Sequence, residues 1–238
     1  MQAFLAILRY DLGLLTRSWI TRIWLPLLVV PALFLVAVAA NEDELASETL
    51  AAYLIAVMIP ISGLAVAVLS SSAVSGESSV IADGILSRSV TRSEYMAAKV
   101  ISRLGFTFVV YMAVMIPFSY LIIRYAAPDT SLGGVAVGLL IVALLLTFLG
   151  ALGITFSTLF SNVLLDVLGL LLVIVLSGAV LQFLGLTWMS TTAIATGLPS
   201  TFRGATPVWD IVRIFLVFSS LTAASIATAF WVFRERDL

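Results

Sequence analysis

The residues of this chain that could do chemistry are concentrated in one polar segment, residues 75–95. Its charged members, together with the glycine that follows Asp83, are Glu77, Asp83, Gly84, Arg88, Arg92 and Glu94. Charges mixed with apolar side chains in this way are typical of a short helix at a membrane surface. We interpret the segment as such a helix followed by a turn, which offers a rigid contact to a protein partner. The alternative is a basic loop without a partner.

The types of residue that are missing exclude several chemistries. The chain has no cysteine and no histidine, which excludes disulfides, thiolate catalysis, histidine-ligated haem, the usual zinc sites and histidine-dependent proteolysis. Its one lysine, Lys99, follows two alanines, so the phosphate-binding pattern Gly-x-x-x-x-Gly-Lys-Ser/Thr is absent. We therefore expect a chain that is not an enzyme, hydrolyses no ATP itself and binds no metal or cofactor.

The composition indicates that the bilayer is the solvent of this chain. Hydrophobic residues make up 62% of the sequence and charged residues 11%, whereas a soluble domain has about 45–50% apolar and about 25% charged residues. So few charges could not cover a surface that faces water. We expect one membrane domain that occupies the whole chain, residues 1–238.

Six apolar stretches are long enough to cross a membrane as helices, which need about 20 residues each. They cover residues 23–40, 50–74, 100–123, 132–160, 163–187 and 211–233. These lengths exceed those of barrel strands, so the predicted fold class is an all-α membrane protein with six transmembrane helices. Only Ser161 and Asn162 separate the fourth and fifth spans, which predicts a tight helical hairpin.

The distribution of basic residues orients these spans, because Lys and Arg favour the cytoplasmic side. Basic residues cluster before span one, between spans two and three, and after span six: Arg9, Arg17, Arg22, Arg88, Arg92, Lys99, Arg103, Arg234 and Arg236. The loop after span one is acidic from Glu42 to Glu44. We expect a multi-pass protein of the plasma (cytoplasmic) membrane with both termini in the cytoplasm.

The segment before span one, residues 1–22, is expected to form an interfacial elbow helix. Between residues 3 and 19 polar and apolar side chains separate onto two faces at helical spacing, although Asp11 lies on the apolar side. A simple extension of span one is the alternative. Ala37-Val38-Ala39 resembles a signal-peptidase site, but Pro26, Pro31 and the length of the apolar run favour a retained span.

Two regions beyond the polar segment have a possible functional role. Residues 188–210 contain two glycines and two prolines between weakly apolar pieces, flanked by Trp188 and Trp209, which suit the membrane interface. From the residues alone, an ordinary loop that lies on the outer membrane surface is one interpretation of this segment. In span five, Gln182 and Ser177 are candidates for lining a pathway, although helix–helix hydrogen bonding explains them equally well.

The polar segment carries a resemblance to a known family. Gly76-Glu77, then the run from Asp83 to Ser87, then the run from Val90 to Tyr95 and finally Lys99 resemble the signature of type-2 permeases of the ATP-binding-cassette (ABC) superfamily. The likeness extends over the chain, with an N-terminal elbow, six spans and a short hairpin between spans four and five. Ser89 stands where the family commonly has proline.

The resemblance implies that residues 75–95 form a cytoplasmic coupling helix that docks on a separate ATPase. Glu77, Asp83, Gly84, Arg88, Arg92 and Glu94 would then be the docking residues. For residues 188–210 it implies short re-entrant helices on the outer side. It also implies two copies of an ABC ATPase subunit, which bind the ATP and Mg, and a second permease as homodimer or heterodimer. Membrane lipid is the remaining expected partner, and nucleic acid is not expected.

The expected function is therefore that of the permease subunit of an ATP-driven exporter. The scarcity of charge within the spans favours a lipid-like, hydrophobic or amphipathic cargo. An ion-coupled secondary carrier is one alternative, and it would need ionisable residues inside the membrane; Asp166 and Arg213 lie near span ends. A membrane scaffold or sensor without transport is the other.

Overall fold

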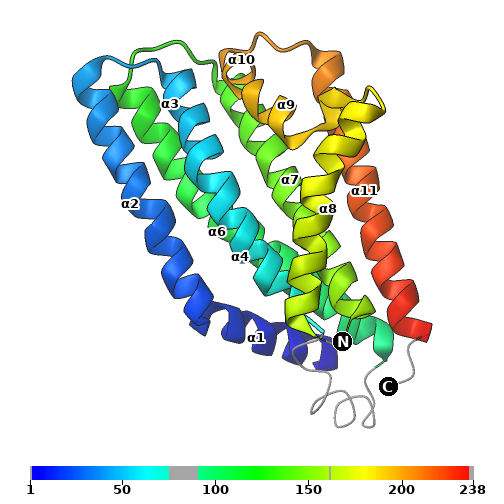
Figure 1. Cartoon of the computed structure of the whole chain (residues 1–238). Coiled ribbons are helices and arrows are strands. Elements are labelled where there is room, and N and C mark those ends of the chain that lie inside the picture. The colour runs from blue at the N-terminus through cyan, green and yellow to red at the C-terminus, as the bar shows by residue number, and fades with distance from the viewer. Residues whose placement is uncertain (1, 75–90, 161, 236–238) are drawn as a thin grey trace.

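The computed structural model describes residues 2–74, 91–160 and 162–235, and within these ranges the chain is helical with no β-strand. Six helical stretches are long and apolar enough to cross a membrane: Trp19–Glu42, Ala46–Ser71, Arg92–Tyr125, Leu132–Leu159, Val163–Phe183 and Val208–Glu235. They form the bundle of Figure 1. The prediction of an all-α fold with six membrane-length helices is confirmed, and the fold indicates a multi-pass membrane protein.

The helices divide into long and short ones. The long ones are α2 (Trp19–Glu42), α6 (Arg92–Tyr125), α7 (Leu132–Leu159), α8 (Val163–Phe183) and α11 (Val208–Glu235). The second span joins α3 (Ala46–Tyr53), a π-helical turn η1 (Leu54–Met58) and α4 (Ile59–Ser71). The others are α1 (Gln2–Arg17), η3 (Thr187–Met189), α9 (Thr191–Thr196) and α10 (Leu198–Arg203).

Helix α6 begins earlier than the apolar stretch predicted, at Arg92 instead of residue 100. Thr91 caps it, because its side-chain oxygen accepts from the backbone N–H of Glu94 at 3.2 Å and the Glu94 carboxylate accepts from the N–H of Thr91 at 3.3 Å. This reciprocal pair is a capping box. Hydropathy locates the part of a helix that lies in lipid, whereas polar caps set where the helix starts.

Helix α7 is the centre of the bundle, packed against α4, α6, α8, α10 and α11. Its glycines allow α4 to approach closely: a Cβ added to Gly153 would lie 2.8 Å from the Cβ of Ser70. On the other side of α4, Trp24 of α2 donates its indole N–H to Ser62 at 3.2 Å. Close packing at small residues and hydrogen bonds between polar side chains therefore hold these apolar helices together.

The bundle has two distinct ends (Figure 1). At the terminal end, α1 runs across the bundle, and the first turn of α6 and the last turn of α11 lie close to it. Arg92 at the start of α6 donates to the carbonyl of Arg234 in the last turn of α11 at 2.9 Å. At the opposite, distal end, the short helices α9 and α10 cover the ends of α3, α7 and α11.

Candidate functional site

A buried cluster of charges joins α1 to α6 at the terminal end. Lys99 Nζ lies 2.8 Å from Oδ1 of Asp11, and Arg103 reaches both carboxylate oxygens, with Nη2 3.0 Å from Oδ1 and Nε 3.1 Å from Oδ2. Ser102 also donates to this carboxylate. The exposed fractions of Asp11, Lys99 and Arg103 are 0%, 1% and 7%. We call these four residues the charge cluster.

Helical spacing presents the cluster to α1. Lys99, Ser102 and Arg103 are three and four residues apart, so they share the face of α6 that packs on α1. Arg103 extends the contact to a third helix, because its Nη1 donates to the carbonyl of Leu69 in α4 at 2.7 Å. The cluster therefore holds α1, α4 and α6 in one register.

The surroundings of Asp11 favour the ionised form of its carboxyl group. Burial alone would raise the pKa of its carboxyl group, but the positive charges of Arg103 and Lys99 and the hydrogen bonds from Lys99 and Ser102 outweigh burial and lower it. The cluster thus contains one negative and two positive charges. Because removing one partner from a buried ion pair leaves an uncompensated charge, the three charged side chains depend on one another.

Two of the predicted docking residues lie in the first turn of α6, which precedes the charge cluster on the same helix. Glu94 closes the capping box of α6, and Arg92 bonds to Arg234. One turn further along α6, Tyr95 stacks on Phe233 of α11 with ring centroids 5.7 Å apart. The other docking residues, Glu77, Asp83, Gly84 and Arg88, lie outside the described residues. The start of α6 therefore contacts α11 on one side and α1 on the other.

The predicted pathway residues lie elsewhere, on α8. Gln182 is exposed near the distal end of this helix, and Ser177 is half-buried and donates to the carbonyl of Ile174 at 2.7 Å. Helix α8 is the least enclosed of the long helices, since 12% of its apolar window is buried. The structure brings neither residue near the charge cluster, and a role in lining a pathway stays a prediction.

Sequence reasoning missed the charge cluster. It treated Lys99 and Arg103 as surface charges that orient the chain, and it treated Asp11 as a flaw in an amphipathic helix. The available signal was the misplaced Asp11 itself, an acid on the apolar face of one helix, together with two cations four residues apart on another. A buried acid on an apolar face needs a partner.

A second set of ionic contacts joins two helices and a loop at the distal end. Arg203 of α10 pairs with Glu48 at 2.8 Å and with Asp129 at 2.9 Å, and Asp129 accepts from the backbone N–H of Ser47 at 2.8 Å. Burial would raise the pKa of Asp129, but the bonds from Ser47 and Arg203 outweigh it and lower the pKa. These contacts fasten α10 to the start of α3 and to the loop before α7.

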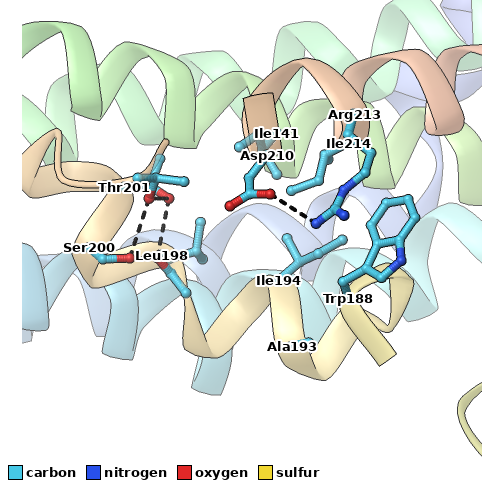
Figure 2. Close-up of a pocket in the computed structure, with 12 residues that line it drawn as sticks. Ile141, Trp188, Ala193, Ile194, Leu198, Ser200, Thr201, Asp210, Arg213 and Ile214 are labelled. Carbon is cyan, nitrogen blue, oxygen red and sulfur yellow. Dashed lines mark hydrogen bonds and ion pairs between the residues drawn. The ribbon is translucent and has the colours of Figure 1, made fainter. Parts of the chain in front are cut away.

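A pocket of about 210 Å³ lies next to these contacts, between α9, α10, α7 and the start of α11. Figure 2 shows Arg213 between Asp210 and the indole of Trp188. Arg213 Nη2 lies 2.9 Å from Oδ1 of Asp210, and its guanidinium carbon lies 3.9 Å from the centre of the Trp188 ring. The pocket thus holds one positive and one negative side chain beside apolar walls.

Comparison with known proteins adds no relative to this description. No protein-family model matches the chain, and no curated protein matches it. The class of the protein therefore rests on its own fold: a multi-pass bundle with six membrane-length helices and a charge cluster at its terminal end.

Proposed function

We propose that this chain is the transmembrane permease subunit of an ATP-driven ABC transporter. The observation that carries the proposal is the position of the charge cluster. It ties α1 and α4 to the early turns of α6, the helix that follows the polar segment with the family resemblance. A force applied to that segment would reach three helices together.

The charge cluster gives this coupling a physical basis. If an ATPase subunit binds residues 75–95, its movement displaces the start of α6. Separating Asp11 from Lys99 and Arg103 would leave buried charges without partners, which costs several kcal/mol. Helices α1, α4 and α6 would therefore move as one rigid unit instead of sliding past one another.

The same proposal assigns the two ends of the bundle. Helix α1 lies across the terminal end and would be the elbow helix in the plane of the inner interface. Both termini and the coupling segment then face the cytoplasm, and the membrane is the plasma membrane. Helices α9 and α10 would form the re-entrant segment on the outer side.

The exposed helices support a second permease as partner. Only 12% of the apolar window of α8 and 17% of that of α11 is buried in this single chain, so both helices present apolar surface to lipid or to another subunit. Two permeases and two ATPase subunits would form the transporter, with ATP and Mg on the ATPase. An interior with few charges suits a lipid-like, hydrophobic or amphipathic cargo.

An ion-coupled carrier is the second candidate, and the charge cluster itself favours it. Ionisable residues inside a membrane commonly serve ion or proton pathways. Lys99 and Arg103 are buried on the membrane-length helix α6, and both contact Asp11 of α1. The two functions differ in their energy source. A carrier would move cargo along an ion gradient without ATP, and the conservative variant Asp11→Asn would abolish that gradient dependence.

Co-purification from the native membrane followed by reconstitution tests the proposal. Mass spectrometry of the complex is expected to identify an ABC ATPase subunit in equal number to this chain, and vesicles that contain the complex are expected to move cargo only with ATP and Mg. The proposal fails if no ATPase co-purifies and the flux of cargo in vesicles is the same with and without ATP. Flux that follows an ion gradient would indicate the carrier, and the absence of any flux would indicate a scaffold or sensor.

A further inference from the structure

With α11 spanning a membrane, the distal pocket would lie near the depth of the lipid headgroups. Helix α11 has 28 residues, so at about 1.5 Å per residue it is roughly 42 Å long, against a hydrocarbon core of about 30 Å. A helix of this length that is centred in the membrane and perpendicular to it would project roughly 6 Å beyond the core at each end. Asp210 and Arg213 lie in its first two turns, and Trp188 and Trp209 are of the residue type that anchors at this interface.

The guanidinium of Arg213 is held in place, but only some of its N–H donors have hydrogen-bond partners. Trp188 covers one of its faces and Asp210 accepts from Nη2. Its Nε is buried and has no acceptor among the described residues. A guanidinium carries five N–H donors in a fixed fork, and the Arg213 side chain is 35% exposed. Its terminal nitrogens, and not the buried Nε, therefore retain donors for an anionic oxygen. Phosphate and carboxylate are the anions that this fork matches, and phosphate is the one that phospholipid headgroups carry.

The pocket also contains a carboxylate, that of Asp210, and a group of threonine hydroxyls. Asp210 has a side-chain exposure of 41%, so one pair with Arg213 leaves carboxylate surface open. Across the pocket, Thr201 and Thr206 lie with their hydroxyl oxygens 3.0 Å apart, and Thr201 donates to the carbonyl of Gly197 (Figure 2 shows the Thr201 side of the pocket). Hydroxyl oxygens that donate one bond can still accept another. This side of the pocket therefore suits a donor cation.

We propose that this pocket binds the headgroup of a zwitterionic phospholipid that carries a primary ammonium. Its phosphate would bind Arg213, its ammonium would donate to Asp210 and the threonine hydroxyls, and Ile194 and Ile214 would contact the glycerol region. The volume of about 210 Å³ is below the range of about 300–1,000 Å³ for drug-sized ligands. The pocket admits a headgroup and not a whole lipid.

The chemistry of the pocket distinguishes this headgroup from its common alternatives. A choline group has no N–H to donate to Asp210, and Arg213 already occupies the face of Trp188 that a quaternary ammonium would use. A glycerol headgroup brings a phosphate but no cation, so Asp210 would repel it. The inference requires only that α11 spans a membrane, and it holds whether or not an ATPase binds this chain.

Native mass spectrometry of the full chain in detergent tests the binding. The protein is offered phosphatidylethanolamine, phosphatidylcholine and phosphatidylglycerol with identical acyl chains. We expect phosphatidylethanolamine to be retained about tenfold better, because one charge-assisted hydrogen bond changes affinity by about that factor. Arg213→Gln should lower retention of both phosphatidylethanolamine and phosphatidylglycerol, whereas Asp210→Asn should lower only the former and raise the latter.

Arg124→Gln is the matched control, because Arg124 is exposed at the distal end of α6 and does not line the pocket. Equal retention of the three lipids by the unaltered protein would overturn the proposal. An equal effect of Arg124→Gln and Arg213→Gln would also overturn it, since the attraction would then belong to the whole surface and not to the pocket.

A labelling experiment keeps the proposal testable if the charge variants do not fold. The chain has no cysteine, so Thr206→Cys places a single thiol in the pocket and Leu132→Cys places one at the exposed start of α7. Maleimide should label the pocket thiol more slowly in nanodiscs of phosphatidylethanolamine than in those of phosphatidylcholine, and label the control thiol equally in both. Equal labelling of the pocket thiol in both lipids overturns the proposal. If soluble glycerophosphoethanolamine protects this thiol in phosphatidylcholine nanodiscs as well as the lipid does, the assignment to a membrane lipid is overturned.

Discussion

Lys99 Nζ and Asp11 Oδ1 lie 2.8 Å apart although the two residues are 88 positions apart in the chain, and both side chains are buried. Arg103 contacts the same carboxylate with two nitrogens and also bonds to Leu69. Substitution of each of the three charged residues therefore leaves a different number of buried charges without a partner. Removing Asp11 leaves two cations, whereas removing Lys99 leaves an Asp–Arg pair with two hydrogen bonds.

This asymmetry predicts an order of stability loss. Asp11→Ala should cost the most, about 3–5 kcal/mol, because two buried cations lose their partner. Arg103→Met should cost less and Lys99→Met least. Thermal or denaturant unfolding in a fixed detergent measures the order. Arg124→Met, which removes an exposed arginine from the same helix, should stay within about 0.5 kcal/mol. A larger loss for Lys99→Met than for Arg103→Met would contradict the bidentate geometry.

Two adjacent glycines at the start of α7 give a second, sharper prediction. A Cβ on Gly134 would collide with the backbone carbonyl of Thr201 and lie 2.6 Å from that of Phe202, whereas a Cβ on Gly133 meets nothing within 4 Å. Gly134→Ala should therefore displace α10 and destabilise the protein by about 1–3 kcal/mol. Gly133→Ala should be neutral or stabilising by up to about 1 kcal/mol, because alanine favours a helix.

Unfolding midpoints of these two variants, measured side by side, test the close approach of α7 and α10. The variants have the same composition and differ by one position, so detergent and expression effects are matched. Equal midpoints would mean that α10 does not lie against the start of α7 at this distance.

Asp129 predicts a dependence of stability on pH. Its folded pKa is below the unfolded value of 3.8, so its contribution is fully present above that value and is lost as pH falls through the folded pKa. The unaltered protein should be more stable than Asp129→Asn near neutral pH, and the difference should shrink as pH falls below about 4. Unfolding midpoints of both proteins over this range measure the difference. A constant difference would show that the carboxylate charge is not what Arg203 and Ser47 recognise.

The six spans could be predicted because membrane crossing is a local property of the sequence. Twenty consecutive apolar residues suffice for a span, whatever lies elsewhere in the chain. The local sequence also contains the signal for the start of α6, because Thr91-Arg92-Ser93-Glu94 has the spacing of a capping box. Hydropathy alone placed that start at residue 100, because Lys99 and Glu94 interrupt the apolar run.

The charge cluster could not be located from the sequence, because its pairing depends on how α1 folds against α6. A sequence shows that Asp11 and Arg103 are charged but not whether water or a partner satisfies them. The distal pocket could not be predicted for the same reason, because Trp188 and Arg213 belong to segments that only the folded bundle brings together. Sequence analysis placed Arg213 near a span end, where its charge alone demanded no partner.

The proposed coupling segment predicts the effect of a double charge reversal, Glu77→Lys with Arg92→Glu. If residues 75–95 dock on an ATPase, complementary charges across that contact become repulsive, and the ATPase should dissociate or hydrolyse ATP without transport. Insertion of this chain should not change, because α6 keeps its Thr91–Glu94 capping box. Reversal of Glu44 and Arg124 at the distal end is the matched control and should leave ATPase binding intact. Co-purified ATPase and the ratio of hydrolysis to flux measure both outcomes. Fully coupled activity in the Glu77 and Arg92 variant would remove the docking role of this segment, because two inverted charges should weaken a contact that depends on them.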